Sequence, residues 1–344
     1  MTTQNILVTG GAGFIGANYT AFAIRQGYTV TVFDNLSRKG AAKNLAWLRE
    51  TFGPDAFQFI HADIRDADAI AAAARDKDAI YHLAGQVAVT TSVHNPREDF
   101  EINALGTFNV LEAARLSGRQ PLVVYASTNK VYGGMEDLRL TETPLRWEYA
   151  DHPHGISETY PVDFHSPYGC SKGAGDQYVR DYARIYGLPT VVFRQSTIYG
   201  LRQFGVEDQG WLAHFVIAVV KNRPISIYGD GKQVRDMLWV EDLIAAYDLC
   251  LHHSAKVAGD IFNIGGGPGN TISIWTESGP RLEALAGHPI PVTYGDWRPG
   301  DQRIYVSDIR KLKATLGWQP QTSLPDGFSR LYHWVKDHPH LFND

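Results

Sequence analysis

Runs of β-branched and aromatic residues recur along the chain, separated by stretches of about 10 to 35 residues. The runs occupy residues 5–10, 29–34, 57–63, 79–85, 122–128, 190–196 and 260–266. Two of the separating stretches, 14–26 and 104–116, have apolar residues at helical spacing. Strands that alternate with crossover helices form a parallel sheet with helices on both faces. The sequence therefore predicts an α/β fold built on a doubly wound parallel sheet.

The composition excludes several classes of protein. Apolar residues make up 44% and charged residues 20% of the chain, and the net charge of −5 comes with no basic stripe, so we expect no nucleic-acid partner. The uncharged apolar run at 215–220 is far shorter than the roughly 20 residues that cross a bilayer. The N-terminus lacks the features of a signal peptide. We expect a cytoplasmic protein with no membrane partner.

Metal ligands are not apparent in the sequence. Cys170 and Cys250 lie far apart and outside any CxxC spacing, which argues against a disulfide scaffold or a zinc site. The thirteen histidines form no cluster at metal-ligand spacing. We expect no bound metal.

A glycine-rich turn follows the first run. Gly10, Gly13 and Gly16 form a GxxGxxG pattern that opens directly into the first helical segment. Glycines here let the backbone approach a pyrophosphate, whose charge is favoured by free amide groups at the helix N-terminus. A tight structural turn is the alternative. The position between strand and helix, with Asp34 at the end of the second run, favours a dinucleotide-binding site.

Asp34 indicates which dinucleotide binds. Its carboxylate accepts hydrogen bonds from ribose hydroxyls and repels a 2′-phosphate, so NAD is favoured over NADP. Arg38 is either a solvated loop charge or a group that lies over the adenine. Asp63, at the end of the third run, is either a ligand of the adenine amine or a helix cap.

A second constellation is the YxxxK pair Tyr168 and Lys172, which share one face of a predicted helix. The ammonium favours the ionised phenol, whose reference pKa of about 10 must fall by roughly 3 units, or about 4 kcal/mol, for ionisation near pH 7. We expect the ammonium, a positively charged nicotinamide and a donor hydroxyl to supply this together. The same spacing recurs at Tyr228–Lys232, in a glycine turn, and at Tyr332–Lys336, near the chain end, and we interpret both as decoys.

An ordered set of segments resembles the extended short-chain dehydrogenase/reductases that act on nucleotide sugars. From residue 6 to about residue 335 it comprises "TGGAGFIG", "DNLSR", "HADIRD", "HLAGQ", "STNKVYG", "YGCSK", "YGDGKQVRDMLWVED", "NIGGG" and "WRPGDQR". The resemblance implies that Tyr168 is the general base and acid on a sugar hydroxyl and that Lys172 holds Tyr168 and the nicotinamide ribose. It also implies that Thr128 bonds the reacting oxygen, with a satisfied strand-end hydroxyl as the alternative.

The resemblance implies the cofactor site and the domain division as well. Besides Tyr168 and Lys172, it assigns to NAD binding Gly10, Gly13, Phe14, Ile15, Gly16, Asp34, Asn35, Ser37, Arg38, Asp63, Ile64, Leu83, Ala84, Gln86, Asn103 and Gln195. We predict a Rossmann-type NAD-binding domain, residues 1–195 and 237–263. We predict a smaller α/β lobe for the nucleotide sugar, residues 196–236 and 264–344.

The residues after Thr128 bear on the reaction. In the family's 4,6-dehydratases an Asp-Glu pair follows the Ser or Thr, because removal of water requires an acid at C6 and a base at C5. This chain has Asn129 and Lys130, and neither does carboxylate acid/base work at neutral pH. We therefore expect hydride transfer without dehydration. Lys130 either contacts the substrate or makes an ordinary salt bridge.

Three segments resemble the CDP-paratose 2-epimerase (CDP-tyvelose epimerase) subgroup of that family: 127–133, 155–173 and 194–211. Thr197 stands where the wider family has an Asn that contacts the pyrophosphate, so that contact is not carried over. An insert of about 30 residues after Gly133 is too long for a plain connection. We interpret it as part of the sugar pocket, with a solvent-exposed loop as the alternative.

The resemblance also implies a set of substrate-binding residues. They are Gln86, Thr128, Asn129, Lys130, Thr197, Gln209, Arg235 and Arg298. Arg235 and Arg298 match positions that grip the diphosphate in relatives, a task that suits the planar guanidinium, and surface salt bridging is the alternative for each. Gln209 either binds the nucleotide or merely caps and packs a helix that begins near Trp211.

These observations favour an isomerase: an NAD-dependent nucleotide-sugar epimerase that inverts C2 of a CDP-sugar through a transient 2-keto intermediate. The nearest alternative is a 4-epimerase of the UDP-glucose/galactose type, which would use the same triad on another carbon. A catalytically silent NAD-binding regulator on the same fold is the alternative from another class. We expect a nucleotide-sugar substrate, with a CDP-sugar favoured, and a homodimer or homotetramer.

Overall fold

The computed structural model describes residues 4–298 and 300–343, and the chain divides into two compact units. Unit 1 contains the chain up to Val131, together with Ser166–Arg194 and Ile244–Phe262. Unit 2 contains Tyr132–His165, Gln195–Leu243 and the chain from Asn263 onward.

These units differ from the predicted domains mainly in one long segment. Residues 132–165, assigned above to the NAD-binding domain, pack in unit 2, as do residues 237–243. The predicted outer ends, residues 1 and 344, lie outside the described residues. The units are defined by packing and not by what they bind, so the predicted division of binding roles stays a prediction.

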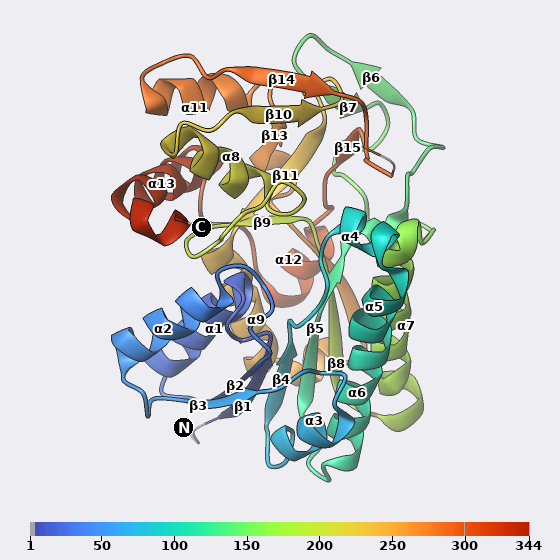
Figure 1. Cartoon of the computed structure of the whole chain (residues 1–344). Coiled ribbons are helices and arrows are strands. Elements are labelled where there is room, and N and C mark those ends of the chain that lie inside the picture. The colour runs from blue at the N-terminus through green and yellow to red at the C-terminus, as the bar shows by residue number, and fades with distance from the viewer. Residues whose placement is uncertain (1–3, 299, 344) are drawn as a thin grey trace. The chain divides into compact units, whose positions relative to one another are not determined.

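Unit 1 is built on a seven-stranded parallel sheet with the order β12-β8-β5-β4-β1-β2-β3 (Figure 1). The strands are β1 (Asn5–Thr9), β2 (Thr29–Asp34), β3 (Gln58–His61), β4 (Ala79–His82), β5 (Leu122–Thr128), β8 (Thr190–Gln195) and β12 (Asp260–Ile264). The inner strands are buried on almost every residue, which explains why their sequences are continuous apolar runs instead of alternating ones. All seven predicted strands are confirmed.

Helices cover both faces of this sheet, with α1 and α2 on one side and α3, α6 and α7 on the other (Figure 1). The helical elements from this part of the chain are α1 (Phe14–Arg25), α2 (Ala41–Phe52), α3 (Ala67–Ala73), α4 (Val89–His94), α5 (Pro96–Phe100), the π-helical η1 (Glu101–Leu105), α6 (Gly106–Leu116), the 3-10 turn η2 (Asn129–Tyr132), α7 (Ser166–Tyr186), α9 (Val240–His252) and α10 (Ser254–Val257). The doubly wound, Rossmann-type fold predicted from the sequence is confirmed.

The strand order reverses at β1. This strand pairs in parallel with β2 on one side and with β4 on the other, so Thr9 lies between Phe33 and His82. In open α/β sheets, ligands bind at the carboxyl ends of the strands beside such a reversal. Gly10 follows β1 and Leu83 follows β4, which places the glycine-rich turn at this position.

In its described part, unit 2 contains smaller sheets. β11 (Val234–Trp239) pairs with an antiparallel β13 and with parallel β9 and β15, while β10 pairs in parallel with β14. The other strands of this unit are β6 (Leu140–Glu142), β7 (Trp147–Tyr149), β9 (Thr197–Tyr199), β10 (Ile225–Tyr228), β13 (Thr271–Ser273), β14 (Val292–Gly295) and β15 (Ile304–Tyr305).

The helices of unit 2 enclose an aromatic core. They are α8 (Trp211–Val220), the 3-10 turn η3 (Pro268–Asn270), α11 (Ser278–Ala286), α12 (Arg310–Leu316), α13 (Leu324–Asp337) and the 3-10 turn η4 (Pro339–Phe342). Leu324, Phe328 and Leu331 recur at helical spacing and bury one face of α13 in the same cluster as Trp239 and Trp275. The predicted start of a helix at Trp211 is confirmed, and its N-cap is Gly210 and not Gln209.

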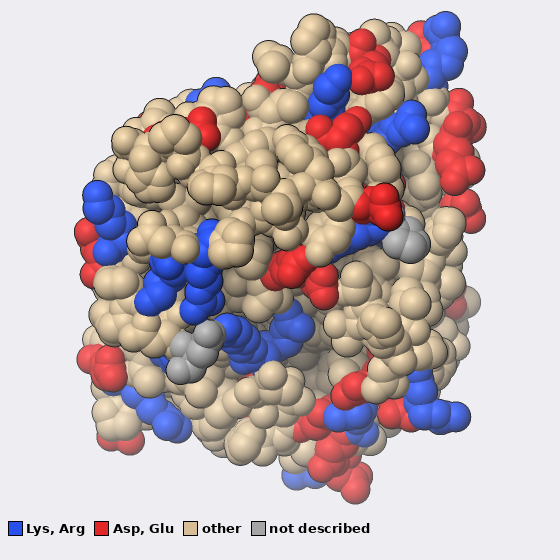
Figure 2. Space-filling model, turned by 45° about the horizontal axis from the view of Figure 1, so that its top comes forward, with Lys and Arg blue, Asp and Glu red and all other residues tan. Residues whose placement is uncertain are grey.

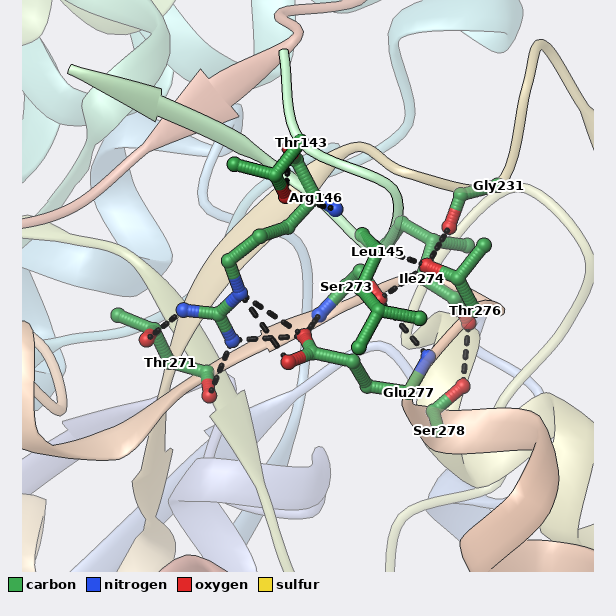
Figure 3. A network of polar contacts seen from close by, with 10 residues as sticks. All are labelled: Thr143, Leu145, Arg146, Gly231, Thr271, Ser273, Ile274, Thr276, Glu277 and Ser278. Carbon is green, nitrogen blue, oxygen red and sulfur yellow. Dashed lines mark hydrogen bonds and ion pairs between the residues drawn. The ribbon is translucent and has the colours of Figure 1, made fainter. Parts of the chain in front are cut away.

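The insert after Gly133 forms an antiparallel hairpin, β6–β7, that the sequence analysis did not predict. Arg146, between the two strands, holds the Glu277 carboxylate with an Nη2–Oε2 distance of 2.6 Å and donates to Thr271 Oγ1 at 3.0 Å (Figure 3). Trp147 Nε1 donates to Asp230 Oδ2 at 2.9 Å. These bonds anchor the hairpin within unit 2, so the insert is not simply a solvent-exposed loop.

Figure 2 shows one face of the molecule, on which basic and acidic side chains both occur and most of the visible surface is neither. Among residues 4–298 and 300–343, no helix combines the length and the apolar character needed to cross a membrane.

Candidate active site

The glycine-rich turn is shaped by close packing. The backbone of Gly10 has a φ of +68°, and a Cβ there would lie 2.7 Å from Ala84 N, at the end of β4. A Cβ on Gly16 would lie 2.1 Å from Gly10 O, which no real structure tolerates. Only glycine fits these two places, so the turn keeps α1 close to the ends of β1 and β4.

The start of α1 fits the pyrophosphate of NAD. Its N-cap, Gly13, has no side chain to satisfy the first-turn amides, and no acidic residue occupies that turn. Phe14 and Ile15, in the same turn, are half-buried. An uncapped helix N-terminus presents free N–H groups and a partial positive charge, which favour a phosphate oxyanion.

Asp34 is built into this turn. Its carboxylate accepts hydrogen bonds from Ala12 N at 3.0 Å and from Leu36 N at 2.7 Å. Burial raises the pKa of Asp34, and these backbone bonds oppose the rise. The negative charge therefore sits directly beside the anion-binding turn, where ribose hydroxyls fit and a 2′-phosphate is disfavoured.

The residues that follow β2 and β3 are linked to each other. Asn35 Nδ2 donates to Asp63 Oδ2 at 2.8 Å, and Ser37 N donates to Asn35 Oδ1 at 3.0 Å. Hydrogen bonds from Arg65 lower the pKa of Asp63 to about 2. The N-cap of α3 is Asp66, whose side chain accepts from Ala69 N, so the helix-cap alternative for Asp63 is wrong.

Buried amides link the end of β4 to η1. Asn103 Oδ1 accepts from Gln86 N at 2.9 Å, and Asn103 Nδ2 lies 3.1 Å from three acceptors: Gln86 O, Asp99 Oδ1 and Ser171 Oγ. Ile64, also assigned to NAD, is buried and packs its side chain where a Cβ on Gly106 would lie. The Asn103 side chain is fully used within the protein, so it orients its neighbours and has no spare donor for a ligand.

Tyr168, Lys172 and Thr128 belong to the same unit. Tyr168 and Lys172 lie one turn apart near the start of α7, and Thr128 is the last residue of β5. All three are buried, with Tyr168 8% and Lys172 5% exposed. The Tyr168 backbone N donates to Ser92 Oγ of α4 at 3.1 Å, which fixes the first turn of α7.

Burial favours the neutral form of both Tyr168 and Lys172. It raises the pKa of Tyr168 to about 12, and the Thr128 hydroxyl and the charge of Arg38 act against the rise. It lowers the pKa of Lys172 to about 7, opposed by Asp176 and Asp99. Protein groups alone therefore leave Tyr168 as a neutral phenol near pH 7, which agrees with the expectation that lysine by itself does not ionise it.

The Lys172 ammonium lies against an aromatic ring. Its Nζ lies 4.2 Å from the centroid of the Tyr125 ring, and no described residue accepts a hydrogen bond from it. A buried ammonium without an acceptor is costly. A ribose hydroxyl of NAD fits this donor, and this is a second feature of unit 1 that suits the cofactor.

The other two YxxxK pairs lie in unit 2. Tyr228 ends β10 and its hydroxyl donates to Glu207, while Lys232 Nζ donates to Glu142 at 2.7 Å. Tyr332 and Lys336 lie on α13, and the Tyr332 side chain is buried in the core of unit 2. Neither pair belongs to the unit that contains Thr128.

Asn129 and Lys130 begin η2, directly after β5. Lys130 N lies 3.3 Å from Thr128 Oγ1, and the Thr128 hydroxyl donates to Asn129 Oδ1 at 3.4 Å. Both residues are half-buried. The pair therefore lies beside Thr128, where the related dehydratases are expected to carry their acids.

In unit 2, the two predicted diphosphate ligands are paired with acids. Arg235 Nη2 lies 2.7 Å from Asp301 Oδ1. Arg298 lies over the Tyr228 ring, 3.9 Å from its centroid, and forms ion pairs with Glu207 at 3.1 Å and Asp208 at 3.2 Å. Both guanidinium groups already make the kind of contact that an oxyanion would make.

The remaining predicted ligands lie on strands and loops. Gln195 is the buried last residue of β8, and Thr197 opens β9 opposite Met237. Gln209 exchanges backbone hydrogen bonds of 3.0 Å with Val206 in both directions. Because Gly210 is the N-cap of α8, the capping alternative for Gln209 is wrong.

Sequence reasoning missed the buried polar residues that support the triad. Asp176 forms a bidentate pair with Arg194, with both distances 2.9 Å, and accepts from Ser127 Oγ at 2.8 Å. Asp99 accepts from Ser171 Oγ at 2.5 Å. The available signal was the spacing: Asp99 lies four residues before Asn103, and Asp176 four residues after Lys172.

Comparisons with known proteins point to one family. A model of the NAD dependent epimerase/dehydratase family matches residues 6–265. The chain is 46% identical to the CDP-paratose 2-epimerase of Salmonella typhi over 339 residues, covering 96% of this chain and 99% of the relative. It is 32% identical to the UDP-glucose 4-epimerase of Mycolicibacterium smegmatis, covering 96% and 98%. The Thermus thermophilus UDP-glucose 4-epimerase, solved with NAD, superposes with a TM-score of 0.80 at 31% identity, covering 97% and 99%.

Proposed function

Since this chain belongs to the NAD-dependent epimerase/dehydratase family, we propose that it inverts C2 of a CDP-activated sugar through a transient 2-keto intermediate. It is an enzyme, an isomerase, and its cofactor is NAD. The observation that carries the proposal is the pair Asn129 and Lys130 directly after Thr128, in a chain that keeps Tyr168 and Lys172. The 46% identity to a CDP-paratose 2-epimerase, which extends over nearly the whole length of both chains, supports C2 as the reacting carbon.

In the proposed reaction, the residues of unit 1 divide the work. NAD, when bound, supplies the acceptor and then the donor of the C2 hydride. Tyr168 takes the proton of the C2 hydroxyl and returns it when the alcohol re-forms. Thr128 donates a hydrogen bond to the same oxygen, and the charge of Lys172 favours the phenolate of Tyr168. Between the two transfers the keto sugar turns its other face to the cofactor.

We propose that the cofactor is held by the groups predicted from the sequence, with one change. The turn at Gly10, Gly13 and Gly16 faces the pyrophosphate, Asp34 takes the adenosine ribose, and Lys172 takes the nicotinamide ribose. Asn103 belongs to the supporting structure, because its side chain is satisfied by protein groups. The other predicted NAD ligands stay as proposed, namely Phe14, Ile15, Asn35, Ser37, Arg38, Asp63, Ile64, Leu83, Ala84, Gln86, Tyr168 and Gln195.

The proposed diphosphate ligands are Arg235 and Arg298. Binding there requires phosphate oxygens to replace Asp301 on the first guanidinium, and Glu207 and Asp208 on the second. This exchange conserves the charge-assisted bonds of each arginine. The other proposed substrate contacts are Gln86, Thr128, Asn129, Lys130, Thr197 and Gln209.

The assembly and location of the protein are part of this proposal. We expect a homodimer or homotetramer in the cytoplasm, with no nucleic-acid or membrane partner. Large exposed apolar residues are concentrated on helices α4 to α7 of unit 1; they are Val93, Phe100, Leu105, Phe108, Leu116, Tyr178, Ile185 and Tyr186. The Phe108 and Tyr178 rings are 6.1 Å apart, so the patch is continuous from α6 to α7, as in a self-association surface.

A labelled substrate distinguishes the proposal from its alternatives. A CDP-sugar deuterated at C2 should give the C2 epimer with its label retained, and reaction in heavy water should add no deuterium there, because the hydride returns within one enclosed site. Proton NMR of the product reads both label and configuration. Exchange of C2 with solvent, or inversion at C4 alone, would overturn the proposal. No turnover of any CDP-, UDP-, GDP- or dTDP-sugar would favour the regulator.

A further inference from the structure

Asp99 is a buried carboxylate that the proposed reaction does not use. It lies on α5, is 1% exposed, and forms no salt bridge within residues 4–298 and 300–343. Its partners are neutral: Ser171 Oγ donates to it at 2.5 Å and Asn103 Nδ2 at 3.1 Å. Burial of a carboxylate without a paired cation is expensive. A buried carboxylate stays ionised where a nearby positive charge stabilises it.

That group is Lys172, the neighbour of Ser171 on α7. The Lys172 ammonium is buried, lacks a hydrogen-bond acceptor among the described residues, and faces the Tyr125 ring. Two carboxylates raise the pKa of Lys172: Asp176, which has the larger effect and is held in a bidentate pair with Arg194, and Asp99, which forms no ion pair with a described residue. Asp99 is therefore the carboxylate near Lys172 whose charge no arginine or lysine cancels through an ion pair.

We propose that Asp99 is a positioning residue that keeps Lys172 charged at working pH and, through Ser171, fixes the turn of α7 that carries Tyr168 and Lys172. The proposal rests on the function proposed above, because it assigns Lys172 a catalytic charge. Ser171 Oγ also lies 3.2 Å from Tyr168 O, so the carboxylate, the hydroxyl and the backbone of Tyr168 form one connected set.

Apart from Asp176, the other groups around Lys172 do not raise its pKa. From β4, His82 stacks on Tyr125 and is neutral, because burial, and next the charge of Lys172, lower its pKa to about 3. From β5, Tyr125 places its ring against the Lys172 ammonium and donates its hydroxyl to the Lys172 backbone O at 3.3 Å, and burial raises the pKa of Tyr125. On α7 itself, Tyr168 lies one turn before Lys172 and Asp176 one turn after it, and Arg38 acts on Tyr168. Asp99 also raises the pKa of Tyr168, which works against the base.

The charge of Asp99 therefore contributes to the pH range of the site. Substitution by Asn removes the charge. Its amide oxygen replaces one of the two acceptor oxygens of Asp99, and its NH2 group can donate a hydrogen bond to Ser171 Oγ in place of the other contact. The pKa of Lys172 should fall, because Asp99 raises it, and the pKa of Tyr168 should fall as well. Both limbs of the pH profile of kcat then move to lower pH. We expect a shift of about one unit, which is the low end of the pKa shifts that a nearby charge causes.

A direct measurement follows Lys172 itself. In full-length, NAD-bound protein labelled with ¹³C at lysine Cε, the Lys172 signal is assigned with Lys172→Met and titrated by NMR. We expect its apparent pKa to fall by about one unit in Asp99→Asn. The matched control is Asp236→Asn, which removes a buried carboxylate of unit 2 that accepts from Ser196 Oγ and two backbone amides, and it should leave the titration unchanged.

Activity gives the second readout. Asp99→Asn should shift the pH profile of kcat to lower pH and reduce kcat about tenfold on the alkaline side, with KM for the CDP-sugar within twofold. Ser171→Ala keeps the charge and should lower kcat without moving the profile. An unchanged Lys172 titration, or equal loss of kcat at every pH, would overturn the proposal.

Two precautions keep the result clear. If Asp99→Asn melts early, Asp99→Ser removes the same charge with a smaller side chain, and the same titration applies to it. The NMR titration requires no sugar, so a failure of the proposed C2 chemistry leaves it readable, and a failure of the titration leaves the labelled-substrate experiment intact.

Discussion

Replacement of Tyr168 by Phe removes a single oxygen from the proposed site, and the structure indicates the size of the effect. Burial raises the pKa of Tyr168 to about 12, so ionisation at pH 7 costs about 7 kcal/mol before NAD binds. Phe cannot ionise at all, and loss of a positioned base costs about 10²- to 10⁴-fold in rate. We expect kcat to fall by at least about 100-fold, which is the lower end of that range.

The same substitution should leave folding nearly intact. Tyr168 loses one neutral hydroxyl interaction with Thr128, and its ring still fills the same space. The free energy of unfolding should change by no more than about 1 kcal/mol. Turnover is measured by NMR on the CDP-sugar, folding by thermal melting, and nucleotide binding by calorimetry with CDP, for which Kd should stay within about threefold.

Tyr332→Phe is the matched control. Tyr332 begins a YxxxK pair on α13 and is buried in the core of unit 2, so its loss tests the spacing without touching the proposed site. Tyr228→Phe is less suitable, because the Tyr228 hydroxyl donates to Glu207, an ion-pair partner of Arg298. A folded Tyr168→Phe with kcat within tenfold of the wild type, or a folded but inactive Tyr332→Phe, would refute this assignment of the base.

Three further changes have expected outcomes. Asp176→Asn leaves the Arg194 guanidinium uncompensated in the interior and should lower the free energy of unfolding by about 3 to 5 kcal/mol, measured by urea denaturation; a loss below about 1 kcal/mol would contradict the burial argument. Gly16→Ala forces a Cβ to within 2.1 Å of Gly10 O, so the purified protein should contain little NAD when denatured and assayed, and a full complement would show that the turn adapts. Leu116→Glu combined with Ile185→Glu places charges in the apolar patch of unit 1 and should give a monomer in light scattering, whereas an unchanged dimer or tetramer would place the interface elsewhere.

The sequence predicted unit 1 closely because its signals are local. Each strand of the seven-stranded sheet corresponds to one of the predicted runs, and the inner strands, which are buried on both faces, have no polar alternation to obscure the run. The glycine pattern could be recognised from the sequence for a similar reason. The positive φ of Gly10 and the close contact at Gly16 exclude other residue types at these positions.

Unit 2 and the hairpin were less predictable because their determinants are distant in sequence. Arg146 anchors β6–β7 through Glu277, which is 131 residues away, and no local pattern reveals that pairing (Figure 3). The strands β9, β13 and β15 have two or three residues each, too few to show a period. Residues 132–165, predicted as part of the NAD-binding domain, pack in unit 2 through such distant contacts.

At the active site, residue types were readable from sequence and protonation states were not. The spacing of Tyr168 and Lys172 suggests a phenol ionised by its neighbour, yet burial shifts both pKa values the other way, to about 12 and about 7. A pKa depends on every charge and on the burial around a group, which sequence spacing does not reveal. Asp99 is an example, because its charge raises the pKa of both groups: this favours the charged form of Lys172 and disfavours the phenolate of Tyr168. A positive charge beside Tyr168 favours its phenolate, and the nicotinamide of bound NAD carries one. In the proposed reaction, ionisation of Tyr168 is therefore coupled to occupancy of the cofactor site.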